Sequence, residues 1–142
     1  MKPKYKLIQP ADLNGLHRIR ALRDFGAVFK GEVGGYVEGE RNLSQKGDCW
    51  VSGVAWVYEL AHVSGSAYIA GTARVYGEAR VGDSAYVYGA ARVSGTAYIV
   101  GSARVSGAAW VYDSACLSTS SCLNGIYALL YIESRRAYTA QL

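Results

Sequence analysis

The sequence predicts an all-β solenoid, and three regularities in the chain of 142 residues carry that prediction. An aliphatic residue recurs every six positions from Val51 to Leu123 without a gap. Four positions after each of them comes a small residue, alanine throughout from Ala55 to Ala115, until Ser121 and Tyr127 break the series. A turn former, most often glycine, follows each aliphatic residue by two positions in almost every hexad. A short, fixed period is typical of stacked coils, so we expect a solenoid that grows by repetition.

The two ends of the chain lack regular hexads and are expected to be caps. At the N-terminus, Tyr5–Gln9 and Leu16–Leu22 fit two short strands, because Asn14-Gly15 between them is a hairpin signal. Residues 31–50 fit a first, irregular coil with a two-residue insertion near Gln45–Asp48. Stacked coils expose unpaired backbone groups at each end, which a cap must cover. We therefore expect a β-hairpin cap over residues 1–30 and the solenoid over residues 31–126.

The short C-terminal tail, residues 127–142, follows the decay of the hexad pattern and contains neither Gly nor Pro. It fits either a helix at Ala128–Ala140 or a last strand, and both remain open. Its apolar residues Leu129, Leu130 and Ile132 suit a cap on the last coil. They suit a contact between subunits equally well.

The hexad Val-x-Gly-x-Ala-x resembles the repeat of left-handed parallel β-helix proteins, the hexapeptide-repeat superfamily. The resemblance is close over residues 51–123 and loose over residues 31–50. It implies that three hexads make one triangular coil, in which the aliphatic residue and the small residue two before it point inward. The residue between them would point outward. The fold class implied is an all-β, left-handed parallel β-helix with an N-terminal β-hairpin cap and a short C-terminal tail.

A second, narrower resemblance lies near the N-terminus. The segments Leu16–Phe25 (LHRIRALRDF), Gly34–Val37 (GGYV) and Leu43–Trp50 (LSQKGDCW) are similar to the N-terminal part of uncharacterised bacterial and phage proteins with hexapeptide repeats. That resemblance implies a phage or prophage source. It implies no activity.

Charge and composition narrow the classes of partner that the protein is expected to bind. Residues 1–50 hold nine Lys/Arg against six Asp/Glu, whereas residues 51–128 hold four of each, so the solenoid offers no basic surface for nucleic acid. No run approaches the roughly 18 apolar residues of a membrane span. The N-terminus lacks the apolar core of a secretory signal. Of the three cysteines, Cys116 and Cys122 fall on different faces. We expect a reduced, cytoplasmic protein of the bacterial host, with neither membrane nor nucleic acid as partner.

Catalytic and metal-binding groups are scarce. The histidines are His17 and His62, and His62 takes an outward position. The hexapeptide-repeat superfamily that the chain resembles includes acyltransferases. These enzymes use a catalytic His and loops that extrude from the corners. The unbroken hexads from Val51 to Leu123 leave no room for such loops. The related carbonic anhydrases need three His ligands for zinc. We expect no enzyme, no metal and no cofactor; the alternative is an acyltransferase-like enzyme that uses His62.

Residues three hexads apart in sequence should stack into ladders, one rung per coil at ~4.8 Å. Two outward ladders mix residue types and begin with Trp50 and His62. The third ladder and the corner that follows it are richest in Trp, Tyr and Arg, and read Trp56, Arg74, Arg92, Trp110 and Tyr58, Tyr76, Ser94, Tyr112. These types dominate binding hot spots, and Arg binds phosphate or carboxylate with two hydrogen bonds. The same side chains also suit a subunit interface, or simple packing on a sheet.

The function expected from these observations is non-catalytic. We expect a homo-oligomer, with a trimer favoured over a dimer, that binds a small anionic, nucleotide-like ligand or a host protein. By analogy with phage proteins that sequester nucleotide signals, an anti-defence role is the specific hypothesis. A purely structural scaffold is a further alternative. The candidate ligand or interface residues are Trp56, Tyr58, Arg74, Tyr76, Arg92, Trp110 and Tyr112.

Overall fold

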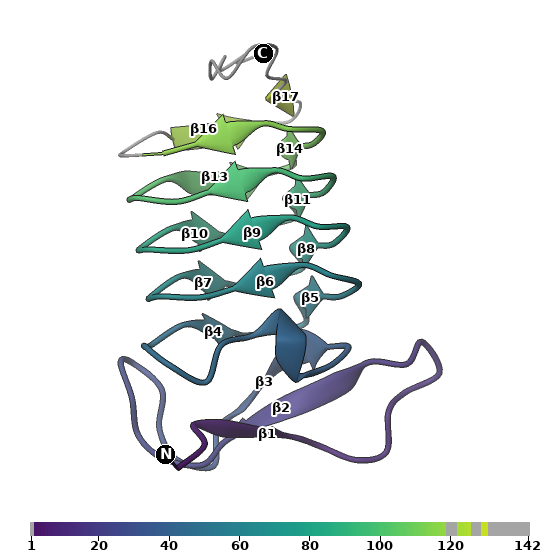
Figure 1. Cartoon of the computed structure of the whole chain (residues 1–142), viewed down its shortest axis with the longest axis vertical. Helices are drawn as coiled ribbons and strands as arrows, with labels where there is room; N and C mark the ends of the chain where they lie inside the picture. Colours follow the sequence, from purple (N-terminus) through teal and green to yellow (C-terminus); the bar gives the residue numbers. More distant parts are fainter. Residues whose placement is uncertain (1, 119–121, 126–128, 131–142) are drawn as a thin grey trace.

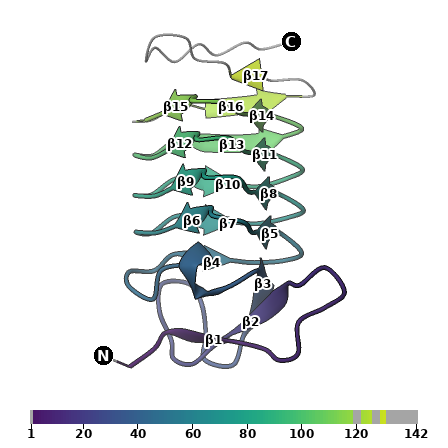
Figure 2. The same ribbon diagram turned by 45° about the vertical axis from the view of Figure 1, so that its right-hand side comes forward.

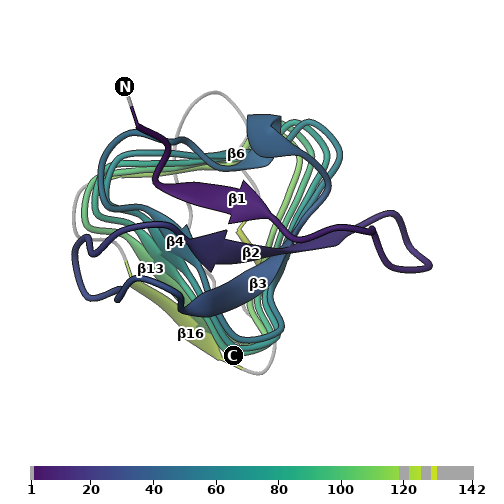
Figure 3. The same cartoon turned by 90° about the horizontal axis from the view of Figure 1, so that it is seen from below.

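The computed structural model describes residues 2–118, 122–125 and 129–130. It is an all-β solenoid of about five turns with an antiparallel section at its N-terminal end (Figure 1). The coils are triangular, and their parallel strands stack into one sheet on each side (Figure 3). Viewed from the N-terminal end, the chain turns counterclockwise as it recedes, so the winding is left-handed. The predicted fold class is confirmed.

Figure 2 shows the strands of the three sheets one above another in columns. Sheet I has eight strands, in the spatial order β1 (Tyr5–Leu7), β2 (His17–Ala21), β3 (Val33–Val37), β5 (Trp56–Val57), β8 (Arg74–Val75), β11 (Arg92–Val93), β14 (Trp110–Val111) and β17 (Leu129–Leu130). Sheet II has five, β4 (Trp50–Val51), β7 (Tyr68–Ile69), β10 (Tyr86–Val87), β13 (Arg104–Gly107) and β16 (Cys122–Gly125). Sheet III has four, β6 (His62–Val63), β9 (Arg80–Val81), β12 (Tyr98–Ile99) and β15 (Cys116–Leu117). A single 3-10 turn, η1 (Glu40–Asn42), is the one helical element in the described part of the chain.

Each regular strand places one outward residue between two inward ones. At β8, Ala73 and Val75 are completely buried, and Arg74 between them is half-buried on the outer face. The Arg74 N–H donates to the Ala91 carbonyl oxygen of the next coil at 2.9 Å. Three such sides, each one hexad long, make a coil, so Arg74 pairs in register with Arg92. The inward alanines and aliphatic residues thereby form a continuous core along the solenoid axis.

One turn position at the corners is glycine in most hexads, because the coils approach closely there. Gly71 adopts φ 67°, a left-handed conformation that glycine reaches at little cost. A Cβ atom on Gly71 would lie 2.8 Å from the carbonyl oxygen of Gly89 in the next coil. The glycine that recurs in the hexads therefore serves both the turn and the contact between coils.

The N-terminal cap is the predicted β-hairpin, and it continues into the solenoid. Strand β2 pairs antiparallel with both β1 and β3, and β3 pairs parallel with β5. Tyr36 of β3 pairs with Trp56, so this first coil is longer by two positions than the regular coil in which Trp50 pairs with Tyr68. The extra positions lie between Leu43, which bridges to Val63, and Trp50. This agrees with the insertion predicted near residues 45–48.

The place of Trp50 in the repeat predicts a side chain exposed on the outer face. The structure buries it instead. It is completely buried, with its ring 5.3 Å from Phe25 and 6.5 Å from Tyr5, both in edge-on geometry. The cap folds over the first rung of sheet II and covers it. The hexad pattern assigns a residue to a face, but a segment outside the repeat determines whether solvent reaches that face.

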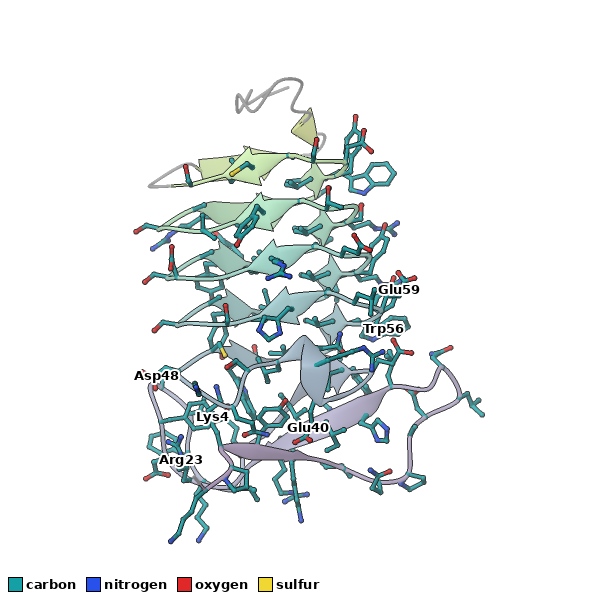
Figure 4. All side chains as sticks on the ribbon, viewed as in Figure 1. Lys4, Arg23, Glu40, Asp48, Trp56 and Glu59 are labelled. Atoms are coloured by element: carbon teal, nitrogen blue, oxygen red, sulfur yellow. The ribbon has the colours of Figure 1, made fainter. Side chains whose placement is uncertain are left out.

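A buried lysine ties the cap to the first coil. The Lys4 ammonium donates to the carbonyl oxygens of Cys49 (2.8 Å) and Gly47 (3.2 Å) and lies 3.3 Å from the Cys49 thiol sulfur. Burial lowers the Lys4 pKa, and the nearby Cys49 opposes that shift. Figure 4 shows Lys4 with Arg23 and Asp48 at the N-terminal end of the solenoid.

Of the C-terminal tail, the structure describes strand β17 alone, whose Leu129 pairs with Trp110. A helix at Ala128–Ala140 is one of the two alternatives. Apart from Leu129 and Leu130, that range lies outside the described residues. The two residues that are described favour the strand alternative at that position.

Substituting Gly71→Ala should destabilise the protein more than Gly15→Ala does. Both glycines have positive φ, so each alanine costs about 1–2 kcal/mol of backbone strain. At Gly15 a Cβ atom meets nothing within 4 Å, whereas at Gly71 it overlaps the backbone of the next coil. Chemical denaturation followed by circular dichroism should show an additional loss of about 1–3 kcal/mol for Gly71→Ala. Equal losses for the two variants would contradict the close approach of the coils.

Substituting Lys4→Met should lower the free energy of unfolding by about 2–3 kcal/mol, because the buried carbonyl oxygen of Cys49 and the partly buried one of Gly47 lose their donor. Lys6→Met is the matched control, since Lys6 lies exposed on the neighbouring strand β1 and should change stability by less than about 0.5 kcal/mol. Thermal melts of both variants measure the difference. If the Lys4→Met variant has the same melting temperature as the wild type, the ammonium does not hold the cap.

Candidate binding hollow at one solenoid corner

Sheet I carries the predicted ladder in register. Trp56 pairs with Arg74, Arg74 with Arg92, and Arg92 with Trp110, so the four lie one above another. Tyr58, Tyr76, Ser94 and Tyr112 follow at the corner that joins sheet I to sheet III. The stacking of the coils thus brings the seven candidate residues to one sheet and its adjoining corner.

The N-terminal half of this surface is closed by contacts among its own side chains. The Arg74 guanidinium lies over the Trp56 ring at 4.3 Å from its centroid, a cation–π contact. Trp56 meets Tyr58 edge-on at 6.1 Å, and Tyr58 stacks on Tyr76 with centroids 5.2 Å apart and planes 13° apart. These rings therefore pack against one another, and of the three only Tyr76 also borders the hollow described next.

The tyrosine ladder has a gap at Ser94. Tyr76 and Tyr112 lie two coils apart, which is about 10 Å at the usual strand spacing. Between them Ser94 supplies only a hydroxymethyl group. A hollow of about 610 Å³ opens at this place, within the range of small-ligand sites. Its walls are formed by the side chains of Glu59, Tyr76, Ser94, Trp110, Tyr112 and Asp113.

The C-terminal wall of the hollow is formed by the pair of Trp110 and Tyr112, whose ring centroids lie 6.0 Å apart. Trp110 is 45% exposed, which is high for the largest aromatic side chain. An indole that already borders a hollow and still exposes this much ring offers a surface on which another flat group can stack.

The turn beside the tyrosine ladder carries the negative charge of the site. Its positive-φ position reads Glu59, Gly77, Gly95 and Asp113, with φ of 57°, 70°, 67° and 54°. Left-handed φ is uncommon for residues other than glycine and is enriched for Asp. Glu59 is held there because its carboxylate accepts the Gly77 N–H at 3.1 Å. In Figure 4, Glu59 and Trp56 lie at the same edge of the solenoid.

Positive charge reaches the same corner from sheet I. Burial raises the pKa of Tyr58 above its usual value, and the neighbouring Tyr76 raises it further. The guanidinium groups of Arg74 and Arg92 oppose this shift, whereas the Glu59 carboxylate adds to it. All of these groups are therefore within electrostatic reach of the Tyr58 hydroxyl, and Arg92 is exposed. The corner has cations on its sheet side and carboxylates on its turn side.

Three lining residues, Glu59, Ser94 and Asp113, were not among the predicted site residues. The sequence does contain a signal for each of them. Ser94 interrupts a series that otherwise reads Tyr58, Tyr76 and Tyr112. Glu59 and Asp113 stand at hexad positions that glycine occupies elsewhere. A break in the repeat is a usable signal only together with the enriched residues, because Asp83 breaks the same glycine series away from the hollow.

Other potential chemical groups lie apart from the hollow. His62 is half-buried on sheet III, and its Nδ1 donates to the Arg41 carbonyl oxygen at 2.7 Å. Cys116 on β15 and Cys122 on β16 lie in different sheets, as expected. Within the described ranges, no three His, Cys, Asp or Glu residues are grouped to hold a metal ion. No helix in the part of the chain that the structure covers is long and apolar enough to cross a bilayer.

Comparisons with known proteins leave the chain without a family assignment. No protein-family model matches it, and no curated protein sequence matches it either. What the structure itself establishes is a β-solenoid of about five turns with parallel sheets.

Proposed function

We propose that this protein is a non-catalytic binding protein that captures a small, nucleotide-like molecule at the corner between sheets I and III. The observation that carries the proposal is the hollow at Ser94, a vacant rung between Tyr76 and Tyr112. The planar ring of the ligand occupies this rung. Its anionic group lies over the adjoining part of sheet I, beside Arg92.

The dimensions of the vacant rung suit one aromatic ring. The Tyr58–Tyr76 pair stacks with centroids 5.2 Å apart. Two such spacings span about the 10 Å that separates rungs two coils apart. A ligand ring at the level of Ser94 therefore contacts Tyr76 on one face and Tyr112 on the other. Base–aromatic stacking contributes about 1–3 kcal/mol per base.

Arg92 supplies the complementary charge for an anionic group. It is an exposed residue of the same coil as Ser94 and lies two positions before it, so both project from the outer surface. Arg74 in the adjacent coil is already engaged by Trp56, which leaves Arg92 as the principal guanidinium for a phosphate. A guanidinium can bind a phosphate through two parallel hydrogen bonds.

A second candidate function is self-association through the same surface, favoured by the 45% exposure of Trp110. In that case a side chain of another copy, and not a small molecule, fills the vacant rung. The expected homo-oligomer, with a trimer favoured over a dimer, is part of this proposal. Native mass spectrometry distinguishes the two functions, because it reports the subunit number and any retained small molecule together.

Substituting Ser94→Tyr should abolish ligand capture, because the new phenol completes the tyrosine ladder and fills the hollow. The probe is adenosine 5′-monophosphate, and quenching of Trp110 fluorescence measures its binding. We expect saturable quenching for the wild type and at least a ~10-fold weaker affinity for Ser94→Tyr, in line with the loss of one stacked base. Melting temperature and circular dichroism should stay as in the wild type.

The control is Ser64→Tyr, which places the same side chain after strand β6 at a different corner. It should leave binding unchanged. Wild-type protein that shows no saturable quenching, or a Ser94→Tyr variant that binds as the wild type does, contradicts the proposed function. A Ser94→Tyr variant that loses subunits in native mass spectrometry supports self-association instead.

A further inference from the structure

We infer that the hollow selects a ring whose edge donates hydrogen bonds, such as the exocyclic amino group of a base, over a ring whose edge carries no donor. This inference rests on the proposed function and adds the chemical class of the base. It follows from the charged groups that line the hollow, which are the carboxylates of Glu59 and Asp113.

The two carboxylates lie on the turn side, opposite the guanidinium groups of sheet I. They belong to the column Glu59, Gly77, Gly95, Asp113, in which the two glycines leave the space beside Ser94 free of side chains. A ring at the level of Ser94 therefore directs its outer edge toward this column. The phosphate end lies toward Arg92, so the site has a defined polarity from sheet to turn.

An ionised carboxylate accepts hydrogen bonds and cannot donate them. An amino group at the ring edge gains a charge-assisted hydrogen bond from it, about twice as strong as a neutral one. A carbonyl oxygen at the same place faces a second acceptor, so that two lone pairs oppose each other. Glu59 is partly committed to the Gly77 N–H, which makes Asp113, in the coil directly above Gly95, the principal acceptor.

The hydroxyl groups in the hollow do not reverse this preference. Ser94 and Tyr76 can each donate or accept, so they accommodate either kind of edge. Tyr112 has an interaction of its own, and it contributes its ring to the wall of the hollow. The discrimination between ligands therefore lies with the fixed negative charge on the turn side.

The test compares adenosine 5′-monophosphate with purine riboside 5′-monophosphate, which has the same purine ring system, ribose and phosphate but carries a hydrogen atom in place of the exocyclic amino group. Wild-type protein should bind the adenosine nucleotide about 5–10-fold more tightly, a modest ratio because Asp113 is exposed. Asp113→Asn should reduce the ratio to about twofold or less, since a neutral amide oxygen accepts a weaker hydrogen bond from the amino group than a carboxylate does. Asn also tolerates the left-handed backbone at this position.

Asp83→Asn is the matched control. Asp83 has the same positive φ at another corner, where its carboxylate accepts the Gly101 N–H, and it does not line the hollow. The control should retain the wild-type ratio. Equal affinity of the wild type for both nucleotides, with binding still lost in Ser94→Tyr, overturns this inference and leaves the proposed function intact. Failure of both nucleotides to bind overturns the proposed function itself.

Discussion

The parallel backbone ladder between successive coils is the constraint on which the rest of this structure depends. Each outward residue is joined through its N–H to a carbonyl oxygen of the next coil, as Arg74 is to Ala91. That ladder stays in register where successive coils have the same length, as the regular coils do, and where their corners pass close to one another. Alanine and branched aliphatic residues inside, and glycine at most of the tight turns, satisfy these conditions, because a Cβ atom at a glycine such as Gly71 would press against the next coil.

A ladder of this kind turns sequence spacing into surface geometry. Side chains one coil apart in sequence are vertical neighbours, so a series of tyrosines becomes a stack of rings, as Tyr58 and Tyr76 are. By the same rule, one small residue in the series becomes a hollow with walls already built. Ser94 requires no loop, hinge or insertion to form a site, because the coils above and below it hold Tyr112 and Tyr76 in place. A ligand of the proposed kind would meet walls that are already in place, so its binding would carry little cost of ordering side chains.

The cap is built from antiparallel strands, whereas the coils pair in parallel. Strands β1 and β2 pair antiparallel, cover the first coil and bury Trp50, which is an outward residue by its place in the repeat. A buried ammonium at Lys4 and the Tyr5 hydroxyl, which donates to the Leu43 carbonyl oxygen, join this cap to the solenoid through backbone acceptors. The open end of the backbone ladder is thereby closed with polar groups that are themselves satisfied.

The sequence by itself determined the solenoid, the hairpin cap, the insertion before Trp50 and the grouping of Trp56, Arg74, Arg92 and Trp110 on one sheet. It could do so because a strict period converts directly into register. Tertiary structure alone decided that Trp50 is covered, that Arg74 is engaged by Trp56, and that the vacant rung at Ser94 is a hollow bordered by Glu59 and Asp113. These outcomes depend on how side chains of different coils fill the space between them. Periodicity assigns a residue to a face, whereas packing determines which parts of that face remain open.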